Sequence, residues 1–290
     1  VPIKVDDPVK LTEDVDAVTD VLAEVVRFSA AIRDRVEAAT AQSDTQIAMT
    51  DFASVVHNQI GQLLLAVKAD HVVAEAIAAH KRGEKPLIAL MNTMEAFLDN
   101  YVSDHGIRPG GRIQLRWNEL LNYALERTLR VSEELPNGDT VIRTINPDDH
   151  GLGDYYRSVQ RAANAVESRF PVSPIDYIIQ KLGKAGVKMA ELTGRQSGIE
   201  YTNFNTGEGI YRVFPVANKN RVVNGFNHGD YDGMLLNASG STGLSAHASV
   251  KFNDKKPRHM MIAQPALDIN VFIQTLGRIK RTGMVSQGTY

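Results

Sequence analysis

The sequence contains no cysteine, and its formal net charge at neutral pH is only −2. Without cysteine there is no disulfide framework, no thiolate metal site and no cysteine nucleophile, which fits a reducing compartment. The small net charge means that any contact with nucleic acid must come from a local patch. No run approaches eighteen consecutive apolar residues, so no transmembrane helix is expected. The first residues, 1–6, carry no signal-peptide pattern.

Residues 9–83 show the apolar periodicity of amphipathic helices. One apolar stripe advances by alternating steps of four and three, with Ser29 in the skipped place: Leu11, Val15, Val18, Leu22, Val25, Ile32 and Val36. Thr50 and Asp51 are suited to cap a second helix that runs to Gly83, a suitable C-terminal cap. We therefore expect residues 1–83 to form a helical linker or packing segment.

After Gly83 the pattern changes to short apolar runs, each followed by a small polar turn. The runs cover residues 85–91, 187–192, 233–237 and 258–264. Helices are expected from Met94 and over 173–183, 219–228 and 268–283. Strand, turn and helix in repetition are the unit of a parallel α/β sheet. The sequence therefore predicts an α/β domain over residues 84–290.

Residues 103–170 interrupt this rhythm. They predict a helix from about Gln114 to Glu133, a turn at 136–138, a strand near 140–145 and a helix near 155–168. We interpret the segment as a mainly helical insertion in the α/β domain.

A small-residue turn, Ser239-Gly240-Ser241-Thr242-Gly243, follows the apolar run 233–237. Ligands of open parallel sheets bind at the carboxyl ends of strands, and successive N–H groups of such a turn form an anion nest. The turn has no lysine, so it is not a Walker A loop. Taken alone, the motif is weak, and a tight structural turn is the plainer interpretation.

Gln274, Arg278 and Arg281 recur at steps of four and three, which predicts one face of a helix. Gly277 between them allows close approach of a ligand. Arginine stabilises charge on a transferring γ-phosphoryl group. Two solvated arginines are the plainer interpretation of this motif alone. Together with the turn at 239–243, it suits a nucleoside triphosphate held between two domains.

Two further turns, Asn92-Thr93 and Thr193-Gly194, follow predicted strands and should lie at the same edge of the sheet. Their small polar groups and backbone N–H groups suit contact with a phosphodiester backbone. Simple helix caps are the alternative.

Other candidate groups carry less chemistry. The histidines form no i, i+4 ligand pair, so no metal site is predicted. A basic run precedes the strand at 258–264 and is a solvated loop or a further nucleic-acid contact: Lys251, Lys255, Lys256 and Arg258.

These segments resemble motifs of superfamily-two helicases. Residues 83–95 resemble the fourth motif of the strawberry-notch-like helicases, and residues 239–245 resemble the fifth motif of the superfamily. Residues 264–265 and 274–283 resemble the strand and sixth motif that follow, and 224–229 looks like the F-N-x-G segment before the fifth. The resemblance covers roughly residues 70–285.

The resemblance implies the second RecA-like lobe of an ATP-dependent helicase or translocase, with helices on both faces of its sheet. It makes Arg278 and Arg281 arginine fingers that reach ATP across a cleft. Nucleotide contacts are implied at Gly240, Gly243, Gln274 and Gly277. Nucleic-acid contacts are implied at Asn92, Thr93, Thr193, Gly194, Ser239, Ser241 and Thr242.

The implied cofactor is ATP with Mg, the metal being held mainly by the first lobe. The implied partners are nucleic acid, expected to be DNA, and a first RecA-like lobe in the same or another chain. A DNA methylase domain is a further implied partner, as in phage- and plasmid-borne proteins of this type. The compartment would be the cytoplasm of a bacterial or phage-infected cell, with association with a virion left open and no membrane expected.

The chain departs from the family pattern in one respect. Its 290 residues contain neither a Walker A lysine nor a DEAD/DEAH motif, both of which the first lobe supplies in the family, so the chain alone should be inactive. Two other functions stay open. One is a non-catalytic structural or interaction module derived from a helicase lobe. The other is a small-molecule α/β enzyme that binds a phosphorylated ligand at the turn 239–243.

Overall fold

The computed structural model describes residues 7–40, 47–49, 52–91, 93–134, 139–237, 245–266, 268–280 and 282–290. The described chain forms two compact units. The first, here called the sheet unit, contains Leu64–Gln114 and Ser173–Tyr290. The second, the helical unit, contains Val5–Leu63 together with Leu115–Val172.

The sheet unit is built on a four-stranded parallel sheet. Its strands are β2 (Lys85–Leu90), β6 (Met189–Leu192), β9 (Gly233–Asn237) and β10 (Arg258–Ile262), in the order β10-β2-β9-β6. Every residue of β2 and β9 is buried, as expected of parallel strands that are covered on both faces. The prediction of a parallel sheet from these four runs is confirmed.

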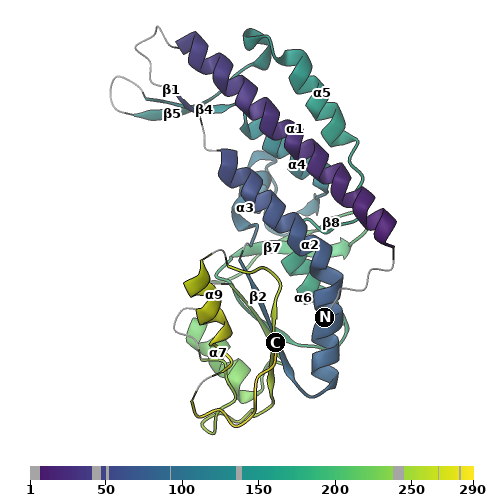
Figure 1. Cartoon of the computed structure of the whole chain (residues 1–290), viewed down its shortest axis with the longest axis vertical. Coiled ribbons are helices and arrows are strands. Elements are labelled where there is room, and N and C mark those ends of the chain that lie inside the picture. Colours follow the sequence, from purple (N-terminus) through teal and green to yellow (C-terminus); the bar gives the residue numbers. More distant parts are fainter. Residues whose placement is uncertain are drawn as a thin grey trace. The chain divides into compact units, whose positions relative to one another are not determined.

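Helices cover this sheet: the second half of α2 (Phe52–Lys81), α6 (Pro174–Lys184), α7 (Lys219–His228) and α9 (Ile269–Leu276). Helix α3 (Glu95–Asp104) follows β2 in the chain and contacts residues 197–203 instead. In Figure 1, α7 and α9 lie on one side of β2, and α6 and α2 lie on the other. Leu87, Phe226, Leu236 and Met260 form part of a continuous apolar core between α7 and the sheet. The fold class is therefore α/β as predicted, and it is consistent with a RecA-like fold.

A second, antiparallel sheet in the same unit was not expected. It consists of β3 (Arg112–Gln114), β7 (Ser197–Asn203) and β8 (Glu208–Val213), in the order β3-β8-β7. Ile199 and Tyr201 of β7 and Tyr211 of β8 are buried. The alternation of these side chains around the turn at Asn205-Thr206-Gly207 was the signal for a hairpin.

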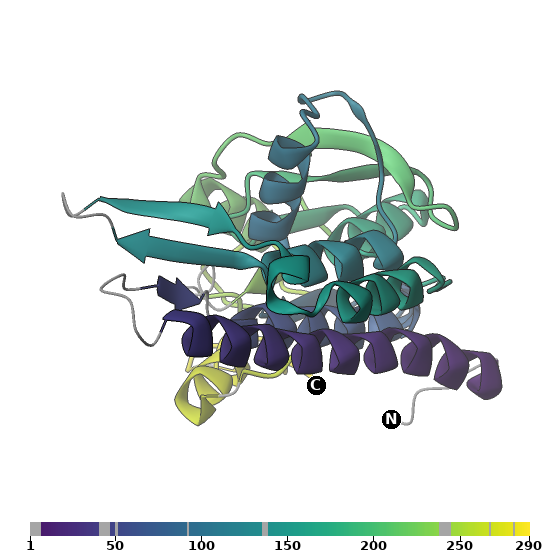
Figure 2. The same ribbon diagram turned by 90° about the horizontal axis from the view of Figure 1, so that it is seen from above.

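The helical unit is centred on α1 (Pro8–Thr40), which lies beside α4 (Trp117–Arg127) and α5 (Gly153–Asn164) in Figure 2. A short 3₁₀ helix, η1 (Pro147–His150), precedes α5. The predicted stripe of α1 faces the core from Val18 to Val36, and Ser29 is buried in its expected place. Phe28 meets Tyr155 and Tyr156 edge to face, with ring centroids 5.5 and 5.6 Å apart.

The helical unit also carries a small antiparallel sheet, ordered β1 (Ile47–Met49), β4 (Arg130–Glu134) and β5 (Thr140–Thr144). The strand near 140–145 is confirmed, but the helix predicted to reach Glu133 ends at Arg127. Strand β4 takes its place because it gains ladder partners on both of its edges. The expected caps Thr50 and Asp51 and the turn 136–138 lie outside the described residues. Within the described ranges, no helix is both long and apolar enough to cross a membrane.

Candidate functional site

The four parallel strands end at one edge of the main sheet, here called the carboxyl edge. Thr93 follows β2, and Thr193 and Gly194 follow β6. Because both strands run parallel to β9, which lies between them, the two turns share this edge as predicted. Asn92 and the whole turn after β9 lie outside the described residues: Ser239, Gly240, Ser241, Thr242 and Gly243.

Hydrogen bonds tie the strand ends together across this edge. Asn237 Nδ2 donates to the carbonyl of Thr193 at 3.0 Å, which joins the end of β9 to the end of β6. The backbone N–H of Met91 donates to Gln264 Oε1 at 3.0 Å, which joins β2 to the residues after β10. These bonds hold the four strand ends as one surface.

The turn after β6 consists of one buried residue and one exposed residue. Thr193 is 5% exposed, and its hydroxyl donates to Glu191 Oε1 at 2.5 Å. Gly194 is exposed with φ of +79°, a conformation that favours glycine. The hydroxyl of Thr193 therefore shapes the turn, while the backbone of Gly194 is the part open to a ligand.

Arg195, directly after this turn, is held by two carboxylates that sequence reasoning missed. Its Nε donates to Glu191 Oε1 and its Nη2 to Asp176 Oδ1, both at 2.6 Å. Asp176 Oδ2 also accepts the hydroxyl of Ser173 at 2.7 Å and the N–H of Ile199 at 2.8 Å. The i, i+4 spacing of Glu191 and Arg195 was the one available signal, since Asp176 comes from α6.

The charge of Arg195 is stable in this position. Burial disfavours the guanidinium, but the Asp176 and Glu191 carboxylates outweigh it and raise the pKa of Arg195 above its ordinary value. Breaking a buried pair of this kind by removing one partner costs about 3–5 kcal/mol. The network is therefore a rigid foundation for the exposed turn.

The first residues of α3 connect the turn after β2 to this foundation. Glu95 accepts the backbone N–H of Gln196, and Asp99 Oδ1 accepts the hydroxyl of Ser197 at 2.6 Å. Met94, just before α3, has φ of +61° and is the one non-glycine residue with positive φ in the described chain. A side chain in this conformation stores backbone strain, which commonly accompanies functional sites.

The prediction that Gln274, Arg278 and Arg281 share one helix face is wrong. Helix α9 ends at Leu276, and Gly277 follows as its C-terminal cap. Ile279 is 1% exposed and belongs to the apolar core, so the chain turns inward where the predicted helix would continue. Gln274 is exposed on α9, whereas Arg281 lies outside the described residues.

Arg278 lies beyond the helix and is only 7% exposed. Its backbone N–H donates to the carbonyl of Thr275 at 3.1 Å, and its carbonyl accepts the N–H of Ala246 at 3.3 Å. Its side chain therefore lies within the sheet unit in this structure.

Helix α9 itself is apolar but has no buried residue. Its first turn is capped by Asp268, whose Oδ1 accepts the backbone N–H of Asn270 at 2.7 Å. Ile269 and Ile273 are 63% and 58% exposed. The face that carries these two side chains and Gln274 is therefore open at the carboxyl edge.

A narrow crevice lies between α9 and the strand ends, lined among others by Met91, Asn237, Gln264 and Phe272. Its cavity volume of about 10 Å³ corresponds to roughly one water molecule. A nucleotide would have to bind on the open surface of the edge, outside this crevice.

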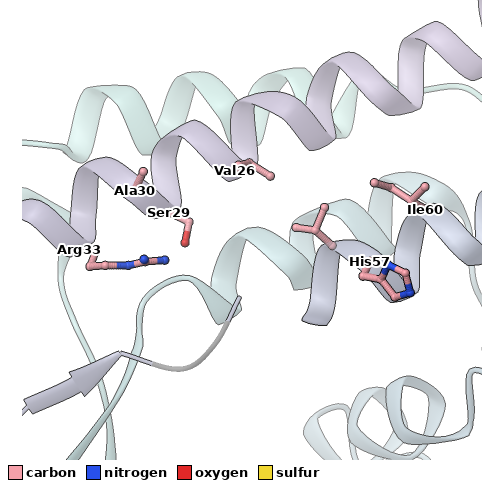
Figure 3. Close-up of a pocket in the computed structure, with 7 residues that line it drawn as sticks. Val26, Ser29, Ala30, Arg33, His57 and Ile60 are labelled. Atoms are coloured by element: carbon pink, nitrogen blue, oxygen red, sulfur yellow. The ribbon is translucent and has the colours of Figure 1, made fainter. Parts of the chain in front are cut away.

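A wider groove lies in the helical unit between α1 and the first half of α2 (Figure 3). Its volume is about 390 Å³, and Val26, Ala30 and Ile60 make its walls mainly apolar. Arg33 and His57 are its charged and titratable members, and both are exposed. Such a groove suits packing more than a reaction.

The basic run before β10 is not uniformly solvated. Arg258 is 1% exposed, and its Nη1 lies 3.3 Å from Asp254 Oδ1. Lys85, the first residue of β2, is equally buried and pairs with Asp254 Oδ2 at 2.8 Å. Two of the cations near the opposite end of the sheet are thus structural and out of reach of nucleic acid.

The described residues contain no group of three or more histidine, aspartate or glutamate side chains that could hold a metal ion. Compared with known proteins, the chain matches no family model, no curated protein and no solved structure.

Proposed function

We propose that this chain is the second lobe of an ATP-dependent DNA helicase or translocase. The observation that carries the proposal is the parallel order β10-β2-β9-β6. It brings to one edge the ends of β2, β9 and β10, the strands that lie within or before the segments that resemble the fourth, fifth and sixth helicase motifs. Ligands of open parallel sheets bind at this edge.

Two features of the edge support nucleic-acid binding. The exposed Gly194 directly precedes Arg195, whose side chain is fixed by Asp176 and Glu191, so the backbone of the turn is well anchored. Backbone N–H groups are common donors to phosphate oxygens. The strained residue Met94 begins the neighbouring turn.

The exposed apolar face of α9 supports a second domain at the same edge. Ile269 and Ile273 would be covered when the first lobe closes, and Gln274 on the same helix would meet the nucleotide. Catalysis would be electrostatic: the arginines would stabilise charge on the γ-phosphate that the first lobe holds with Mg. Arg278 would have to turn outward from its buried position.

The test is ATP hydrolysis by the complete gene product carrying Arg281→Ala. Removal of an arginine finger typically lowers turnover by about 10³-fold or more, while binding and folding persist. Arg35→Ala, at an exposed position of α1, is the matched control and should hydrolyse ATP normally. ATPase activity within twofold of wild type in the Arg281 variant would contradict the assigned role.

The alternative is an interaction module derived from such a lobe. The absence of a Walker A lysine from the 290 residues and the apolar face of α9 favour it. A complete gene product that neither hydrolyses ATP nor binds DNA at low salt would establish this alternative over the motor.

A further inference from the structure

A second pocket lies along α7, lined by residues that the crevice beside α9 does not share. Its volume is about 320 Å³, within the range of small-molecule sites. It is lined by Asn220, Asn224 and Asn227 of α7 and by Ser245 and Phe252.

The three asparagines advance by steps of four and three, so they share one face of α7. Asparagine is a poor helix former, and a solvated helix face has no need of three. Asn220 and Asn224 are exposed at the pocket, whereas Asn227 is 1% exposed. This face of α7 therefore carries two exposed amides and one buried amide.

The buried amide lacks a partner on one side. Asn227 Nδ2 donates to the carbonyl of Ser245 at 3.1 Å, which fixes the orientation of the side chain. Its Oδ1 has no hydrogen-bond partner in the described structure. A buried acceptor in this state is stabilised by any ligand that brings an N–H group to it.

Phe252 supplies an aromatic wall that is only half buried. His228 and His247 hold its ring edge to face, with centroid distances of 5.9 and 6.2 Å. The loop beneath is anchored by the backbone N–H of Asp254, which donates to the carbonyl of Asn227 at 3.2 Å. The ring is thus a preformed platform for stacking a planar group.

We propose that this pocket binds a nucleobase, with adenine preferred. The base would stack on Phe252, and its edge would meet the amides of Asn220 and Asn224. Stacking on an aromatic side chain and bidentate pairing of asparagine with adenine are established modes of base recognition. The exocyclic amino group supplies the N–H that Asn227 Oδ1 lacks, and Lys219 at the rim lies where a phosphate would follow.

The base could belong to a free nucleotide or to a single strand, and the experiment separates the two. The 290-residue chain is titrated with adenosine 5′-monophosphate by calorimetry, and with a labelled oligo-dA of about ten nucleotides by fluorescence anisotropy. Saturable binding is expected for at least one probe. Phe252→Leu and Asn224→Ala should each weaken it about tenfold.

Asn253→Ala is the matched control, because Asn253 is exposed beside the pocket without lining it, and this variant should bind like wild type. Tight binding of the mononucleotide supports a free nucleotide, and binding of the oligonucleotide alone supports an unstacked base. Absence of saturable binding for both probes, or binding that neither pocket variant weakens, overturns the proposal. Asn224 is exposed, so its variant keeps the test valid if Phe252→Leu fails to fold.

The proposal does not depend on the motor function. Asn224, Asn227 and Ser245 lie in segments that resemble helicase motifs, but base binding needs neither Arg281 nor a first lobe. A normal ATPase in the Arg281 variant would leave it standing, and a failure of base binding would leave the motor proposal standing.

Discussion

The two ends of the main sheet bury ionic groups in opposite proportions. At the carboxyl edge one cation, Arg195, lies between the carboxylates of Asp176 and Glu191. At the amino edge, where β2 and β10 begin, two cations share one carboxylate: Lys85, Arg258 and Asp254. The unfavourable burial of charge is therefore compensated in two different ways at the two ends of the same sheet.

At the amino edge, main-chain carbonyls and a ring take the place of the missing carboxylate. Lys85 Nζ donates to the carbonyl of Phe226 at 2.5 Å, and Arg258 Nε donates to the carbonyl of Ala246 at 3.1 Å. Both cations also lie over the Phe226 ring, at 4.3 and 5.1 Å from its centroid. Burial lowers the pKa of Lys85 and of Arg258 below their ordinary values in spite of Asp254.

The two ends of the sheet differ in how much of their polar surface is exposed. At the amino edge, Lys85, Arg258 and Asp254 form a buried cluster. At the carboxyl edge, the ion pairs of Arg195 lie beneath the surface, and the turn at Gly194 is exposed. This contrast, more than any single residue, is what the proposed function expects between a structural edge and a binding edge.

The largest expected effect comes from removing the central cation of the carboxyl edge. Arg195→Met would leave the buried Asp176 and the partly buried Glu191 without a cation and should lower the free energy of unfolding by about 3–5 kcal/mol. Arg258→Met leaves Asp254 paired with Lys85 and strands carbonyl acceptors, for a loss of about 1–3 kcal/mol. Urea unfolding of both variants measures the difference. Equal losses would mean that the two edges tolerate buried charge alike.

A smaller effect is expected from crowding the carboxyl-edge network without removing a charge. A Cβ on Gly198 would lie 2.7 Å from Asp176 Oδ1 and 2.9 Å from Arg195 Nη1. Gly198→Ala should therefore cost about 1–3 kcal/mol in urea unfolding. The control, Gly183→Ala, adds a Cβ with no atom within 4 Å on helix α6 and should stabilise by about 0.5–1 kcal/mol. An unchanged free energy of unfolding in Gly198→Ala would show that the side chains of the network can move to accept the new Cβ.

The smallest effect concerns the pH dependence of the amino edge. Burial would raise the pKa of Asp254, but the hydrogen bond from Lys85 outweighs it and holds the pKa below its ordinary value of 3.8. The unfolded chain then binds a proton first as the pH falls, so the stability contributed by Asp254 is present above about pH 4 and is lost below it.

Unfolding in urea between pH 5 and about pH 2.5 measures this contribution as the difference between wild type and Asp254→Asn. The gap between the two should narrow as the pH falls. Asp20→Asn, at an exposed position of α1, should run parallel to wild type. A constant gap for Asp254→Asn would remove the acid-sensitive contrast between the edges.

The sequence by itself determined the elements with strong local patterns. The four apolar runs were recognised as parallel strands because each is short, apolar and followed by a polar turn, and two of them, β2 and β9, are buried throughout. The stripe of α1 from Val18 to Val36 follows the helical repeat, with Ser29 buried in the one place where no apolar residue stands. Their common edge followed from parallel pairing alone.

Only the tertiary structure decided the features that depend on distant partners. Asp176 of α6 meets Arg195 through folding, and no spacing in the sequence announces that pair. Helix α9 ends before Arg278 because Ile279 is drawn into a core made by β2, β9 and α7. Periodicity records what a residue does within its own element, whereas burial of a charge or the end of a helix depends on what packs against it.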